Sequence, residues 1–76
     1  MEENTAHELL ILIEQETGKT ASLDTKIQDL GIDSLDFLAL IVEVQTKFSV
    51  TIKDAEIPKI QTIQDLLNTI HAHIPA

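Results

Sequence analysis

The chain has 76 residues, enough for one small domain, and its hydrophobic content of 43% is sufficient to form a core. Thirteen acidic residues against five basic ones give a net charge of −8, which argues against binding to nucleic acid or to anionic membrane surfaces. The chain has no cysteine, which excludes disulfides and thiolate metal sites, and no apolar run approaches the length of a membrane span. We therefore expect a single acidic domain over residues 1–76, monomeric and cytoplasmic, whose partners carry basic patches.

The first predicted helix spans residues 6–17. Thr5 and Glu8 form the capping-box pattern that is typical of a helix start, and Gly18 provides a natural stop at the other end. Hydrophobic residues recur at helical spacing and define one inner face: Ala6, Leu9, Leu10 and Ile13, with Leu12 beside them. This face predicts a helix that packs against the rest of the domain.

Residues 19–33 form a long connection without a sustained hydrophobic period. A loop of this length in a compact domain is usually functional or is packed by its own side chains. We expect Leu23, Ile27 and Leu30 to fix the connection across the helices. A connection fixed in this way lets the second helix run in a direction that a tight hairpin would not allow.

The second predicted helix, residues 34–48, carries two hydrophobic stripes. At about 100° per residue, the first stripe forms a narrow core face: Phe37, Leu40, Ile41, Val44 and Phe48. The second stripe consists of Leu35, Leu38 and Val42 and lies well away from the first. A surface helix usually needs only one stripe. The second is therefore either a contact surface for other proteins, or it is covered by the long connection or by the third helix.

The segment after the second helix begins as an extended connector, with Val50 and Ile52 pointing inward. Residues 54–57 could form one helical turn. Pro58 biases the residue before it away from helical angles, so we expect this turn to be short or irregular.

The last predicted helix starts at Thr62, which forms a capping box with Asp65, and Pro75 ends it. Its core stripe consists of Ile63, Leu66, Leu67, Ile70 and Ile74. Together the elements predict an all-α fold, a small four-helix bundle with a long loop between helices one and two and a short third helix.

The junction between the long connection and the second helix reads Leu30-Gly31-Ile32-Asp33-Ser34-Leu35-Asp36. Gly31 permits a turn that a side chain would hinder, and Asp33 is a good helix N-cap. Ser34 then lies in the first turn, where unpaired N–H groups and the helix dipole favour a negative charge such as a phosphate ester. Taken alone, the four residues Asp33-Ser34-Leu35-Asp36 are equally typical of an ordinary capped helix with no modification.

The whole junction resembles the modification site of acyl carrier proteins, and the resemblance extends to chain length, acidity and helix order. It implies that Ser34 receives 4′-phosphopantetheine from a separate phosphopantetheinyl transferase, and that this enzyme recognises Asp33. The thiol of this group would hold acyl intermediates as thioesters and deliver them to enzymes of fatty-acid, lipid or polyketide-type synthesis. The chain itself would not be an enzyme, and we identify no catalytic residue because no nucleophile–base pair can be placed from the sequence.

Residues beside Ser34 are predicted to contact acyl-loading and acyl-processing enzymes with basic docking patches: Leu35, Asp36, Leu38, Val42 and Glu43. The second helix is less acidic than is typical of fatty-acid carriers, because it keeps only two carboxylates and adds Lys47. This difference is compatible with a specialised pathway and a different set of partner enzymes.

The aliphatic core suggests a place for the cargo. A bundle of this composition could part to admit an alkyl chain, because each buried CH₂ contributes about 0.8 kcal/mol. Separating packed side chains would offset part of that gain. We expect medium or long acyl groups to fold back between helices two and three, near Leu40, Val44 and Ile57.

Two alternatives remain open at this stage. A carrier for aminoacyl or peptidyl groups in nonribosomal synthesis usually has two glycines ahead of its serine, whereas Gly31-Ile32-Asp33-Ser34 favours the acyl class. The other alternative is an unmodified helical interaction module that binds through Leu35, Leu38 and Val42. We expect no metal site at His7, His71 or His73, because residues two apart do not share a helix face and no carboxylate is obviously placed with them.

Overall fold

The computed structural model describes residues 2–73, with side chains from residue 5 onward. It contains three α-helices and two short 3₁₀ helices: α1 (Glu2–Thr17), η1 (Ile27–Leu30), α2 (Ser34–Phe48), η2 (Ile57–Lys59) and α3 (Ile63–His73). Within this described part there is no strand, only an isolated bridge between Lys26 and Thr62. The predicted all-α class is confirmed.

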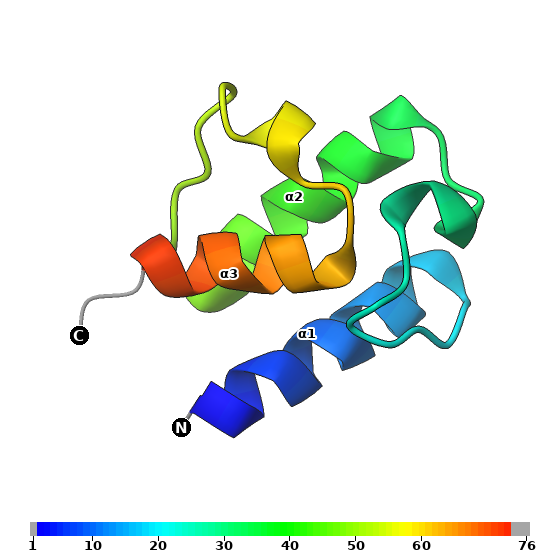
Figure 1. Ribbon diagram of the computed structural model, residues 1–76, viewed down its shortest axis with the longest axis horizontal. Coiled ribbons are helices and arrows are strands. Elements are labelled where there is room, and N and C mark those ends of the chain that lie inside the picture. Colours follow the sequence, from blue (N-terminus) through cyan, green and yellow to red (C-terminus); the bar gives the residue numbers. More distant parts are fainter. Residues whose placement is uncertain (1, 74–76) are drawn as a thin grey trace.

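The three α-helices enclose one aliphatic core. In Figure 1, α3 lies between α1 and η2, and α2 runs diagonally past it; α1 contacts both α2 and α3. The α-helices contribute most of the buried side chains: Leu9, Leu12, Ile13, Leu40, Ile41, Val44, Ile63, Leu66, Leu67 and Ile70. The predicted inner faces of all three helices are therefore confirmed by burial.

The long connection is held in place by side chains and by backbone hydrogen bonds. Ile27 and Leu30 are buried in the core and Leu23 packs against it, as predicted. The backbone N–H of Ile27 donates to the carbonyl of Gln61 at 2.8 Å, and the N–H groups of Ile63 and Gln64 donate to the connection at 3.0 and 2.9 Å. The bonds from Ile63 and Gln64 satisfy donors of the first turn of α3, which have no partner within the helix. The connection is thereby fastened to the start of α3.

The start of α1 differs from the prediction. The helix begins at Glu2, so Thr5 lies inside it and is not its N-cap. Glutamate is a good helix former, and threonine within a helix costs only a few tenths of a kcal/mol, about 0.7 at most. The capping-box pattern at Thr5 and Glu8 therefore did not mark the helix start.

The short third helix is present as the 3₁₀ helix η2, which begins later than the turn predicted over 54–57. Pro58 lies in its first turn, where the missing N–H of proline has no helical partner to lose. The preceding turn is closed by Glu56, whose Oε2 accepts a hydrogen bond from the Lys53 N–H at 3.0 Å. The expectation of a short, irregular element is met.

The start of α3 is a complete capping box, as predicted. The Asp65 N–H donates to Thr62 Oγ1 at 3.1 Å, and Asp65 Oδ2 accepts from the N–H groups of Gln61 and Thr62 at 3.1 and 3.2 Å. These two backbone donors hold the pKa of the Asp65 carboxyl below its usual value. The predicted stop at Pro75 and the core residue Ile74 lie outside the described residues.

Candidate functional site

The junction before α2 is a sharp turn at Gly31. This residue caps η1 with a φ of +72°, in the left-handed region that favours glycine. A Cβ placed there would lie 3.1 Å from Lys19 Nζ, so the lysine side chain also covers this point. The turn directs the chain away from the buried Leu30 and into the start of α2.

Asp33 is the N-cap of α2, as predicted. Its Oδ1 accepts a hydrogen bond from the Asp36 N–H at 2.9 Å, and its backbone carbonyl accepts the first helical bond from Phe37 at 2.9 Å. Ser34 is the first residue of α2 and is exposed. Its hydroxyl is therefore accessible to a modifying enzyme, in a turn whose N–H groups and dipole stabilise a phosphate.

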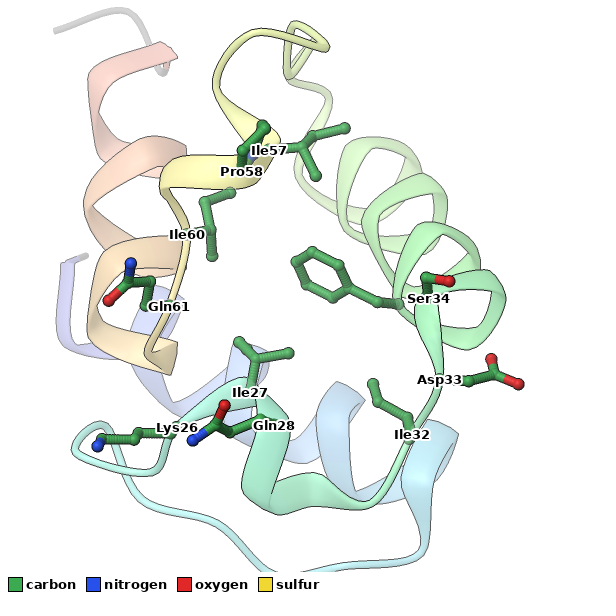
Figure 2. A pocket seen from close by; sticks show the side chains of 11 residues that line it. Lys26, Ile27, Gln28, Ile32, Asp33, Ser34, Ile57, Pro58, Ile60 and Gln61 are labelled. Atoms are coloured by element: carbon green, nitrogen blue, oxygen red, sulfur yellow. The ribbon is translucent and has the colours of Figure 1, made fainter.

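A cavity of about 580 Å³ lies beside Ser34. Its lining comes from the second half of the long connection, the start of α2 and the segment around η2: Lys26, Ile27, Gln28, Ile32, Asp33, Ser34, Phe37, Ile57, Pro58, Ile60 and Gln61. Figure 2 shows the side chains of Ile27, Ile32, Ile57 and Ile60 converging from different sides, while the Asp33 carboxylate points away from the cavity. The lining is therefore mixed, with converging apolar side chains and several polar residues.

The cavity differs in position from the acyl site predicted from the sequence, because residues of η1 line it. Ile57 lines it, as expected, but Leu40 and Val44 are only 1% and 0% exposed and belong to the closed core instead. Four cavity residues were not singled out as cargo contacts in the sequence: Ile27, Ile32, Phe37 and Ile60. Ile27 and Ile32 belong to the long connection, which has no hydrophobic period, so nothing in the sequence indicated which of its side chains face inward.

The second stripe of α2 faces outward. Leu35, Leu38 and Val42 are 76%, 44% and 57% exposed, so the alternative in which the connection or third helix covers them is wrong. Asp36 and Glu43 are also exposed and share this side of the helix by their spacing. We call these five residues the outer face of α2.

A histidine–carboxylate pair joins the end of α3 to the segment before η2. His73 Nε2 lies 3.0 Å from both carboxylate oxygens of Glu56. The Lys53 N–H and this histidine lower the pKa of the Glu56 carboxyl. The expectation that no carboxylate accompanies the histidines is therefore wrong for His73. Among the residues that the structure describes, no cluster of three or more metal-ligating side chains is found.

Within residues 2–73, no helix is both long enough and apolar enough to cross a bilayer. The predicted cytoplasmic location and monomeric state stay predictions.

The comparisons with known proteins agree on one family. The family model described as "Phosphopantetheine attachment site" matches residues 7–70. The chain is 42% identical over 59 residues to an "Acyl carrier protein" of Onion yellows phytoplasma, covering 76% of this chain and 78% of that protein. It is 43% identical over 53 residues to an "Acyl carrier protein" of Campylobacter concisus, covering 68% and 69% of the two chains.

The fold has a counterpart among solved structures. The crystal structure of an acyl carrier protein from Thermotoga maritima superposes with a TM-score of 0.78, over 95% of this chain and 88% of that one. The sequence identity is 23%, so this likeness concerns the fold alone.

Proposed function

The chain belongs to the family of acyl carrier proteins with a phosphopantetheine attachment site, and we propose that Ser34 is the residue that carries the prosthetic group. Members of this family are carriers and not catalysts, and their 4′-phosphopantetheine is covalently attached. That group supplies a terminal thiol, which the chain lacks because it has no cysteine.

The observation that carries the proposal is the position of the Ser34 hydroxyl. It is exposed at the first residue of α2, directly after the Asp33 cap and at the margin of the cavity. A phosphodiester at this atom would lie beside the first-turn N–H groups, where a negative charge is favoured. The rest of the chain then acts as a tether that raises the effective concentration of the cargo at each enzyme.

Substitution of Ser34 tests the attachment site. After co-expression with a broad-specificity phosphopantetheinyl transferase, the wild-type chain is expected to gain the mass of one arm by intact-mass spectrometry, and Ser34→Ala to gain none. The matched control is Ser22→Ala, which removes another exposed serine and should gain the arm as the wild type does. A wild-type chain that is folded but stays unmodified would contradict the proposal.

We propose that the cargo is an acyl group of fatty-acid, lipid or polyketide-type synthesis. Ile32 and Asp33 ahead of Ser34, together with relatives that bear the name acyl carrier protein, support this class. The alternatives are a peptidyl or aminoacyl carrier and an unmodified interaction module. Loading assays with acyl-transferring and amino-acid-adenylating enzymes separate the first two, and the mass measurement on the wild type decides the third.

We propose that the outer face of α2 is the surface on which the transferase and acyl-processing enzymes dock. Its exposed aliphatic side chains can be buried by a partner, and the net charge of −8 favours basic patches around them. Val42→Ser is expected to lower the rate of acyl transfer by about tenfold, because truncating a side chain that matters at an interface costs more than about 1 kcal/mol. Ile11→Ser changes a side chain that is 40% exposed on α1 and should leave the rate unchanged. Equal rates for both variants would count against this surface.

We also propose that the acyl chain folds into the cavity beside Ser34. Four isoleucines from the long connection and the η2 region line the cavity, and each buried CH₂ contributes about 0.8 kcal/mol. Methyl NMR of the thiol and acylated forms should show shifts at Ile27, Ile57 and Ile60 on acylation. If these methyl signals do not move, the cargo is not sequestered there.

A further inference from the structure

We propose that Phe37 limits the length of the acyl chain that the cavity accepts, and so determines cargo specificity. This inference rests on the proposed function of Ser34 and on cargo binding in the cavity. It concerns one side chain that the attachment chemistry itself does not use.

Phe37 lies one helical turn after Ser34 and lines the same cavity. It is half-buried and packs against the core cluster. Apart from Phe37, the large apolar side chains in the lining are isoleucines. The aromatic ring is therefore the bulkiest apolar group on the cavity wall.

The same residue is the last one along α2 that lines the cavity. Phe37, Leu40 and Ile41 share the inner stripe of the helix, but only Phe37 lines the cavity. Leu40 and Ile41 are 1% and 2% exposed and lie in the core beyond it. A cargo that advances along α2 from Ser34 therefore meets the ring before it can reach these core side chains.

The position of the ring is set by rigid backbone. The Phe37 N–H donates to the Asp33 carbonyl at 2.9 Å, in the first hydrogen-bonded turn of α2. Asp33 in turn caps the helix through Asp36. The ring can change rotamer, but its backbone cannot move away without breaking the helix start. A chain longer than the present cavity must displace the ring or remain outside.

The test uses holo-protein loaded with straight saturated chains from butanoyl to dodecanoyl. For each form, the thermal midpoint is measured relative to the thiol form of the same variant. In the wild type this shift should rise with chain length and then level off. In Phe37→Ala it should keep rising for chains at least about two carbons longer, because removal of a six-carbon ring leaves vacant space. Phe37→Trp should level off at a shorter chain than the wild type.

Phe48→Ala is the matched control. Phe48 is the only other aromatic residue, lies on the same helix, is half-buried against the core and does not line the cavity. Its removal should lower the midpoint of every form without changing the chain length at which the shift levels off. If Phe37→Ala does not fold, Phe37→Leu takes its place, with a smaller extension in the same direction.

Identical chain-length profiles for the wild type and the Phe37 variants would overturn the inference, as would the same extension in Phe48→Ala. These failures differ from a failure of the proposed function. If Ser34 receives no arm, both ideas fall at the loading step. If all variants load and carry acyl groups but their profiles coincide, only the role of Phe37 is refuted.

Discussion

Leu30→Ala is expected to lower the free energy of unfolding by about 2–5 kcal/mol, the usual range for truncating a buried leucine. Leu30 is 2% exposed, although it belongs to the four-residue helix η1 and not to one of the α-helices. Single domains have a total stability of about 5–15 kcal/mol, and one of this size lies near the lower end of that range, so the expected loss is a large part of the total. Chemical denaturation followed by circular dichroism would measure the loss.

Leu35→Ala is the control for this change. It removes the same atoms five residues further on, but Leu35 is 76% exposed, so the stability should stay within about 0.5 kcal/mol of the wild type. The comparison has a functional meaning, because Leu30 directly precedes the Gly31 turn that leads into Ser34. If Leu30→Ala is as stable as the wild type, burial of η1 does not hold this junction in place.

The parts of the fold that could be predicted are those with local signals. The bounds of α2 were predicted as they are found, because Asp33 marks its start and the core stripe ends at Phe48. The capping box of Thr62 and Asp65 likewise marked the start of α3. Both signals consist of side chains that bond to backbone groups three residues away, so the neighbouring sequence contains all that is needed.

A local signal can also mislead. The pattern at Thr5 and Glu8 satisfies the capping-box rule, yet these residues continue a helix that starts at Glu2. The pattern alone does not show whether the preceding residues are helical. The choice depends on the propensity of the residues before it, which are good helix formers here.

The helix start at Asp33 and Ser34 could be predicted, but the cavity beside it could not. Ser34 and Asp33 lie in one short motif. The isoleucines of the cavity come from the connection and from the η2 region, and they meet because backbone bonds join residues 23–27 to residues 61–64. No periodicity encodes these pairings. The contact between His73 and Glu56 was missed for the same reason, since 17 residues separate the two side chains.

Asp33→Asn is expected to reduce the rate of phosphopantetheine attachment by about ten- to a hundredfold while leaving the domain folded. The resemblance to acyl carrier proteins implies that the transferase recognises the Asp33 carboxylate. A charge-assisted hydrogen bond to that carboxylate would contribute about 1.5–3 kcal/mol, which the amide would lose. Asparagine is as good an N-cap as aspartate, so the bond to the Asp36 N–H can be kept. The measurement is the initial rate of modification by intact-mass spectrometry, with unfolding followed in parallel.

Asp33→Ala separates the two roles of the residue. It removes the cap as well as the charge, so it should lower the stability by about 1 kcal/mol and also slow the modification. Asp29→Asn removes a nearby charge from η1 without touching the cap, and its rate should stay close to that of the wild type. If Asp33→Asn is modified at the wild-type rate and only Asp33→Ala is slow, Asp33 acts through the helix cap that positions Ser34, and recognition of its charge is excluded.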